Sequence, residues 1–314
     1  MDRVLVLYYS QSGEVAEIAT VFATELSRTG AEVTIEGLDT ETLYPYPWRS
    51  IRRFFDVMPE SVLGLPPPIR SPGYDPTSRF RLVVLVYPVW FLSPALPVQA
   101  LFQLRHAQVL HGTETVTITV CRAMWQRASE RIKSLLATAG AVHCDNVVVT
   151  HQGSPLLTLV STPRALLFGR KESLLGLFPK AGVAHSDRAR VQLLATVIAQ
   201  RLRSDRSFGG SFLSGESALS ITHWLVVPEL LASYCFYSAA VVIRALGKIH
   251  PALRALGVYA FAVFLLALIL IGLPLSITVS ALAWLGMRKR LDAYVNEVSK
   301  PTGISHQTRT DSVH

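Results

Sequence analysis

The sequence predicts an α/β domain with a doubly wound, five-stranded parallel sheet, followed by a C-terminal pair of transmembrane helices. Two observations predict the domain: short, continuous apolar runs recur up to residue 150, and stretches with helical spacing alternate with them. A third observation predicts the membrane helices. Half of the 314 residues are hydrophobic, the mean hydropathy is +0.35, and the apolar excess lies largely after about residue 220.

The first expected strand, residues 3–9, is apolar, as in a parallel strand that is buried on both faces. A turn rich in hydroxyl groups follows it, and a helical pattern begins at Val15. Such a turn is a typical phosphate site, because backbone N–H groups and the positive end of the helix dipole point at it. Ser10 and Ser12 would add donors, and Gly13 would let the backbone approach closely. The turn holds no Lys or Arg, so we expect neutral donors; the alternative is an ordinary turn capped by Ser12.

The remaining elements follow from the same alternation. Four further strands are expected, at residues 32–38, 81–87, 115–120 and 147–150, the first of them nearer an edge. Helices are expected at about residues 95–106, 126–138 and 187–203. Two long connections remain, residues 39–79 and 151–187; we expect the first to cover the carboxyl end of the sheet, a packed crossover being the alternative. Ligands of such sheets bind outside the carboxyl ends of the strands, so the loops after the first, third and fourth strands should converge on one crevice.

Those loops carry aromatic rings and a cation. Trp90 and Phe91 offer flat surfaces to a planar ring, although a tryptophan in the core is the alternative. Arg122 would stabilise the anionic reduced form of a flavin near its pyrimidine end. The residues expected to bind this cofactor are Ser10, Gln11, Ser12, Gly13, Glu14, Val15, Pro88, Val89, Trp90, Phe91, Cys121, Arg122 and Trp125.

Several segments carry a resemblance to known families. The turn at residues 10–15 resembles the flavodoxin phosphate loop, with Val15 where a last hydroxyl residue is usual. The segment Tyr87-Pro-Val-Trp-Phe-Leu-Ser-Pro-Ala95 is similar to the flavin-flanking segment of flavodoxin-like quinone and NAD(P)H reductases. Taken together with four further segments, the segment 87–95 is closer still to bacterial proteins labelled dialkylresorcinol condensing enzymes. The four segments are Tyr8-Tyr-Ser-Gln-Ser-Gly13, Phe54-Phe-Asp-Val-Met-Pro-Glu-Ser-Val62, Cys121-Arg-Ala-Met-Trp125 and Pro179-Lys-Ala-Gly-Val183.

This resemblance covers about residues 1–205 and implies a flavodoxin-like fold with FMN as cofactor. It also implies conversion of an alkylated cyclohexanedione to a resorcinol, beside a ketosynthase that makes aryl lipids. The sequence offers no nucleophile and base pair for carbon–carbon condensation, whereas aromatisation of a dione is a dehydrogenation that a flavin can perform. Tyr9, Tyr87 and His151 could transfer protons there, and Cys121 could be reactive beside Arg122. Packing is the alternative for each, and no catalytic base is assigned.

Two apolar segments, residues 224–243 and 257–285, meet the length of about 20 residues that a bilayer helix needs. Glu229 interrupts the first, where it could snorkel or face a partner. Basic residues before the first segment and after the second favour both ends in the cytosol, but others lie between the segments and weaken this signal. A hairpin in one leaflet is the alternative.

The expected organisation is therefore an FMN domain at 1–205, a linker at 206–222, the helix pair within 223–287 and a polar tail at 288–314. We expect the inner (cytoplasmic) membrane as location, with the flavin domain facing the cytosol, and no cleaved signal peptide. Membrane lipids and a lipid-like or quinone-like small molecule are the expected partners.

The composition argues against other classes. The net charge of +8 is dispersed and no RNA-reader motif accompanies it, which disfavours nucleic acid. The three cysteines are widely spaced and form neither a disulfide framework nor a metal pattern. The open alternatives are an NAD(P)H:quinone reductase, an electron-transfer module at the membrane and a flavodoxin-like scaffold that has lost its cofactor.

Overall fold

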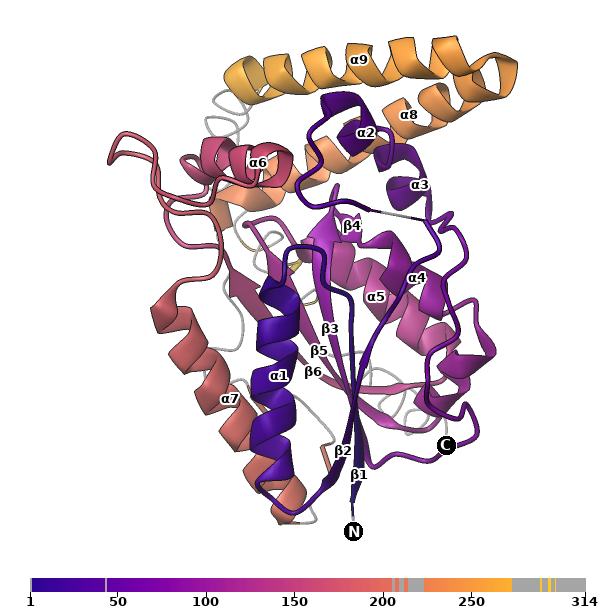
Figure 1. Cartoon of the computed structure of the whole chain (residues 1–314), viewed down its shortest axis with the longest axis vertical. Helices are drawn as coiled ribbons and strands as arrows, with labels where there is room; N and C mark the ends of the chain where they lie inside the picture. The colour runs from indigo at the N-terminus through magenta and orange to yellow at the C-terminus, as the bar shows by residue number, and fades with distance from the viewer. Residues whose placement is uncertain are drawn as a thin grey trace.

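The computed structural model describes residues 2–42, 44–204, 207–208, 212–213 and 223–272, together with Lys289, Ala293, Tyr294 and Glu297. Five parallel strands form one sheet in the order β2-β1-β3-β5-β6 (Figure 1). Their bounds are β1 Arg3–Tyr8, β2 Glu32–Gly37, β3 Leu82–Trp90, β5 Glu114–Cys121 and β6 Val142–Thr150. The two-residue strand β4, Ser93–Pro94, pairs antiparallel with the end of β3. Counted along the chain without β4, the parallel strands have the order 2-1-3-4-5, with β2 at an edge. This is the order of the flavodoxin-like fold, which was the predicted fold.

Helices cover both faces of the sheet. Helices α1 (Glu14–Ser27) and α7 (His185–Arg203) pack on the face that carries Val4 and Val6. The opposite face, with Leu5 and Leu7, receives α4 (Leu96–Leu101), the 3₁₀ helix η1 (Arg105–Leu110) and α5 (Gln126–Thr138). Alternate residues of β1 therefore belong to two separate cores, which is why the strand is apolar throughout.

Some bounds differ from the prediction. The helix expected at 95–106 ends at Leu101 and gives way to η1, and β6 begins five residues before the expected strand at 147. Helix α6, Thr158–Phe168, lies within the connection that was expected to be a loop. It contains Pro163, which weakens a helical prediction from sequence.

A group of helices from separate parts of the described chain lies over the carboxyl end of the sheet (Figure 1). Helices α2 (Ile51–Phe55) and α3 (Met58–Leu63) come from the connection 39–79, which covers this end as expected. They are joined by α6, by α8 (Val226–Ile249), which follows the 3₁₀ turn η2 (His223–Leu225), and by α9 (Pro251–Ala267). Helix α9 continues as a π-helical turn, Leu268–Gly272.

The two apolar segments form the helices α8 and α9, each long and apolar enough by length and composition to cross a membrane. Helix α8 runs on to Ile249, past the end expected at residue 243, so Arg244 and Lys248 lie in a helix and not in a link. Helix α9 begins at Pro251, six residues before the expected start. Hydropathy marks the apolar part of a helix and misses its charged last turns. Residues 273–285 of the second expected span and nearly all of the expected tail lie outside the described residues.

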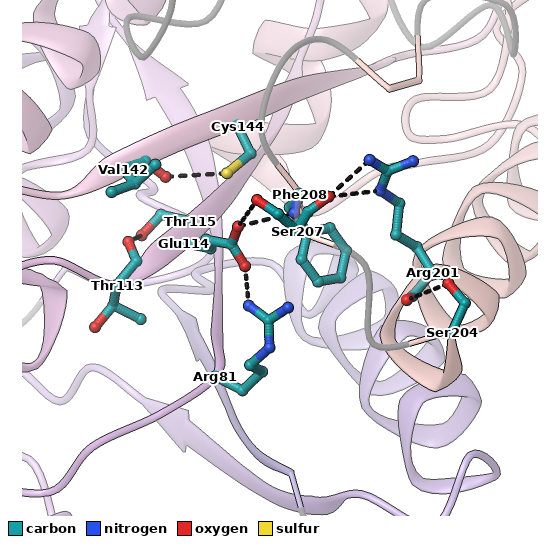
Figure 2. A network of polar contacts seen from close by, with 10 residues as sticks. All are labelled: Arg81, Thr113, Glu114, Thr115, Val142, Cys144, Arg201, Ser204, Ser207 and Phe208. Atoms are coloured by element: carbon teal, nitrogen blue, oxygen red, sulfur yellow. Dashed lines mark hydrogen bonds and ion pairs between the residues drawn. The ribbon is translucent and has the colours of Figure 1, made fainter.

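A polar network at the amino end of the sheet fixes the chain after α7 (Figure 2). Glu114, at the start of β5, pairs with Arg81 and accepts hydrogen bonds from Ser207 Oγ (2.7 Å) and from the backbone N–H of Phe208 (2.8 Å). Most of the expected linker, residues 206–222, lies outside the described residues. The described Phe208 and Leu213 are fully buried in the core, so these positions pack on the domain.

Candidate functional site

The turn between β1 and α1 leaves backbone donors open at the start of a helix. Gly13 is the N-cap of α1, with a left-handed φ of 91°, and no side-chain hydrogen bond caps the first turn. Ser12 therefore does not serve as the cap. Ser10 Oγ is buried and makes no hydrogen bond with the described residues. Unfilled donors at a helix N-terminus form a site for an anion.

A cation from a distant segment reaches this turn. Lys171 Nζ lies 3.3 Å from the carbonyl oxygen of Ser12 and 3.4 Å from Glu14 Oε1. His151 Nε2 lies 3.4 Å from Glu14 Oε2. Burial disfavours the charged carboxylate of Glu14, but the hydrogen bonds and charges of His151 and Lys171 outweigh it, so the pKa of Glu14 lies below its ordinary value of 4.5. The expectation of neutral donors alone is thus corrected, since it considered only the residues of the turn.

The loop after β3 is a tight two-residue hairpin turn onto β4. Its central residues, Phe91 and Leu92, both have positive φ values, 51° and 61°. Gly and Asn are the usual residues at such positions, and bulky ones store backbone strain of about 1–3 kcal/mol each. The ring of Phe91 lies 5.1 Å from that of Phe54 and 6.0 Å from that of Phe55, centroid to centroid. These contacts from α2 hold the strained turn in place.

Trp90 lies in a cluster of aromatic rings. Its centroid is 5.5 Å from that of Tyr9, 5.1 Å from that of Tyr44 and 6.5 Å from that of Trp48, each in an edge-to-face arrangement. Gln11 Nε2 joins the turn between β1 and α1 to the segment 44–48 by donating a hydrogen bond to the carbonyl oxygen of Pro45 (3.1 Å). The loops after β1 and β3 are therefore braced against residues 44–48.

A cavity of about 630 Å³ lies between these loops and the covering helices. Its sheet-side wall contains ten of the predicted residues: Gln11, Ser12, Glu14, Val15, Pro88, Val89, Trp90, Phe91, Cys121 and Arg122. The opposite wall is largely apolar and comes from α2, α6, α8 and α9; it includes Ile51, Phe54, Leu159, Leu166, Leu231, Phe236, Ala262 and Leu265. The volume suits a small-molecule or cofactor site. The part of this wall that α2 supplies agrees with the expectation that residues 39–79 cover this end of the sheet. The parts from α6, α8 and α9 were not predicted, because nothing in the sequence places these helices over the sheet.

Three predicted residues do not line the cavity. Ser10 and Gly13 lie in the same turn as Ser12 but not in the cavity wall. Trp125 is only 1% exposed, packs with Cys121 and Val148, and precedes the first residue of α5. It belongs to the core that supports the cavity wall.

Arg122 brings a guanidinium group into the cavity wall. Its Nη1 donates to the carbonyl oxygen of Pro155 (2.8 Å) and lies 3.4 Å from Thr158 Oγ1. The start of α6 therefore fixes its position. A held cation in an apolar wall can stabilise negative charge that develops on a bound ring.

Among the proton-transfer candidates, only His151 lines the cavity. Tyr87 is fully buried and accepts a hydrogen bond from Thr119 Oγ1 (2.8 Å), and burial raises the pKa of both Tyr87 and Tyr9. Burial also raises the pKa of the Cys121 thiol, so this cysteine stays neutral and is a poor nucleophile. His151 Nδ1 lies 3.5 Å from Thr162 Oγ1. No cluster of metal ligands occurs within the described part of the chain.

No protein-family model matches the chain, and no curated protein matches it. Solved structures with a similar arrangement include a flavodoxin from the domain Archaea, 10% identical over 64% of this chain and 99% of that one, with a TM-score of 0.36. A WrbA-like flavodoxin from Agrobacterium tumefaciens is 10% identical over 66% of this chain and 100% of that one, with a TM-score of 0.35. Rubredoxin oxygen:oxidoreductase from Desulfovibrio gigas is 11% identical over 65% of this chain and 37% of that one, with a TM-score of 0.37.

Proposed function

We propose that this protein is a membrane-associated, FMN-dependent oxidoreductase that acts on a lipid-like ring. One observation carries the proposal: an open anion site, an aromatic loop and a held cation line one cavity at the carboxyl end of a flavodoxin-like sheet. In this topology the switch in strand order lies between β1 and β3, and ligands bind there.

The residues present fit the phosphate group of FMN. Ser10 Oγ is buried without a hydrogen-bond partner in the described structure, as expected of a donor whose partner is a bound anion. The open first turn of α1 adds further donors, and the ammonium group of Lys171, which is paired with Glu14, lies beside it. Trp90 and Phe91 supply the aromatic surfaces for the ring system. FMN, when bound there, supplies the acceptor for a hydride.

The side chains around the cavity have separate roles. Arg122 holds the enolate oxygen that forms when the substrate loses the proton beside its carbonyl, or the pyrimidine end of the cofactor. His151 accepts a proton, and Glu14, whose Oε2 lies 3.4 Å from His151 Nε2, orients the imidazole. The apolar wall from α6, α8 and α9 excludes water and receives an alkyl chain.

For the substrate we propose an alkyl cyclohexanedione that becomes a resorcinol, in the biosynthesis of aryl lipids. The conversion removes two hydrogens from the ring, one as a hydride and one as the acidic proton beside a carbonyl, and enolisation completes the aromatic ring. Support comes from the resemblance of residues 54–62, 87–95, 121–125 and 179–183 and from the alkyl-compatible cavity wall. A ketosynthase of the same pathway is the proposed source of the dione.

The proposed location is the inner (cytoplasmic) membrane, with the sheet domain facing the cytosol. Support comes from the apolar helices α8 and α9 and from the basic residues Arg244, Lys248 and Arg254 near the turn between them. A substrate with long alkyl chains would partition into the same membrane.

A quinone reductase is the second candidate, favoured by the likeness of residues 87–95 to quinone and NAD(P)H reductases. Turnover of the FMN-loaded, detergent-solubilised protein separates the two. Our proposal predicts that an alkyl cyclohexanedione gives a resorcinol with stoichiometric loss of two hydrogens to an added electron acceptor. Rapid oxidation of NADPH by simple quinones, with no product from the dione, would favour the quinone reductase.

A further inference from the structure

We infer that α8 and α9 do not cross the bilayer: they lie flat in one leaflet, and the cavity opens into that leaflet. The inference rests on the membrane association in the proposed function, but not on its flavin. The structure carries it through three observations: the length over which α8 contacts the sheet domain, the stripe of exposed apolar residues on both helices, and the rim of the cavity.

Helix α8 contacts the sheet domain along most of its length. At its first turn, Glu229 is only 1% exposed and accepts a hydrogen bond from the backbone N–H of Arg127, across 2.8 Å. Fifteen residues later, Arg244 Nη1 lies 3.7 Å from Glu60 Oε1 of α3. At 1.5 Å per residue these contacts are about 22 Å apart along the axis. Between them, Phe236 and Ala240 pack in one cluster with Met58.

The turn between the two helices is also tied to the domain. Arg254, in the first turn of α9, pairs with Asp56 (Nε to Oδ1, 2.7 Å) and with Glu60 (Nη2 to Oε2, 2.8 Å). A helix pair that crossed about 30 Å of hydrocarbon would bring these charges and the attached domain into the bilayer. Figure 1 shows the two helices lying side by side across the end of the sheet, with α9 outermost.

The faces turned away from the domain carry stripes of exposed apolar and tyrosine residues at helical spacing. On α8 they are Tyr234, Tyr237 and Val241; on α9 they are Leu256, Tyr259, Val263 and Leu266, and Leu270 follows in the π-helical turn. Val263 is 70% exposed and Tyr234 is 72% exposed. Tyrosine is typical of the membrane interface, and an apolar face this long marks contact with lipid or protein. The apolar composition of both helices and the exposed Lys248 near their common turn favour an anionic lipid leaflet.

The cavity reaches this lipid-facing surface. Four large apolar residues line it and are also exposed: Ile51 of α2, Leu156 before α6, Leu231 of α8 and Leu266 of α9. Their side chains make the cavity wall continuous with the outer apolar face. An alkyl chain can therefore pass from the leaflet to the site without crossing water, which assigns the site a substrate that dissolves in the membrane.

The test is the side of the membrane on which the turn at His250 lies. In a Cys235→Ser background, His250→Cys and Ser27→Cys are made separately in the full chain; Cys121 and Cys144 are buried, and Ser27 lies at the far end of α1. Sealed inner-membrane vesicles of either orientation are treated with a membrane-impermeant maleimide. Because His250 caps α9 through Ala252 N (3.1 Å), the exposed Lys248→Cys provides a second position.

A hairpin in one leaflet predicts that positions 250 and 248 are labelled in the same vesicles as position 27. Labelling only in vesicles of the opposite orientation means that the helices span the membrane and overturns the inference. Labelling of the turn only after detergent, or recovery of the chain as a soluble dimer, overturns it as well. Flavin content is measured on the same samples, so a protein without flavin would refute the proposed cofactor while the labelling still decides the topology.

Discussion

The Glu229 carboxylate of α8 accepts a hydrogen bond from the backbone N–H of Arg127 at the start of α5, although 102 positions separate the two residues. The open end of a helix in the sheet domain is thereby satisfied by a residue of an apolar helix. The same end of α5 follows the loop that carries Cys121 and Arg122. The pair of apolar helices, α8 and α9, is therefore joined to α5, next to the loop that supplies Cys121 and Arg122 to the cavity wall.

Replacement of Glu229 with Ala should lower the free energy of unfolding by about 1–2 kcal/mol, because the first turn of α5 loses a buried acceptor. Glu229→Gln keeps an acceptor oxygen and should lose less. Thermal unfolding of the detergent-solubilised protein measures both. Equal melting temperatures for the wild type and the Ala variant would show that this contact does not join the hairpin to the domain.

Ser10→Ala should weaken FMN binding without destabilising the protein in the absence of FMN. A hydrogen bond to a charged group contributes about 1.5–3 kcal/mol, so the affinity should fall roughly ten- to a hundredfold. The melting temperature without flavin should stay level or rise, because Ser10 Oγ has no partner among the described residues. Quenching of flavin fluorescence gives the affinity, with the exposed Ser27→Ala as control. An unchanged affinity would remove Ser10 from the site.

Lys171→Met should weaken the binding of FMN but not of riboflavin, which lacks the phosphate. The physical reason is the position of Lys171 Nζ, 3.3 Å from the carbonyl oxygen of Ser12 in the turn between β1 and α1. The loss should be about tenfold and should shrink as salt is added. Titrations with both flavins measure it. An equal loss for the two would mean that Lys171 supports the loop and not the phosphate.

His143 should make the protein acid-sensitive. Its ring is 2% exposed, and burial, together with the charge of Lys133, lowers its pKa from 6.5 to about 4. The folded state thus binds this proton less readily than the unfolded chain. The stabilisation is complete above about pH 6.5 and is lost as the pH falls toward 4, by roughly 3 kcal/mol in all. Unfolding free energies between pH 7 and 4 should fall less steeply for His143→Gln than for the wild type. Parallel curves would contradict the assignment.

The sheet could be predicted because its determinants are local. Short apolar runs such as residues 3–9 are typical of central parallel strands, which are buried on both faces. The helix predicted at 126–138 has the same bounds as α5. The turn at Ser10–Gly13 was found for the same reason, since strand, turn and helix are contiguous. The type of fold and three of the loops around the cavity follow from this information.

The other half of the cavity could not be predicted from local pattern. Lys171 and His151 approach Glu14 from segments more than 130 positions away, and no periodicity encodes that contact. The hydropathy pattern of the apolar helices is the same whether they cross a membrane or lie over a sheet. Hydropathy reports composition and not the contacts that Glu229 and Arg254 make. The strained Phe91–Leu92 turn departs from turn propensities, which favour Gly and Asn there.

The visible absorption spectrum of the purified, detergent-solubilised full chain, taken before and after denaturation, tests the central claim most directly. The account predicts two flavin bands and the release of FMN on heating, or their appearance when FMN is added to protein that was purified without it. A colourless protein that fails to bind added FMN would contradict the account, and the cavity would then belong to a membrane-associated scaffold.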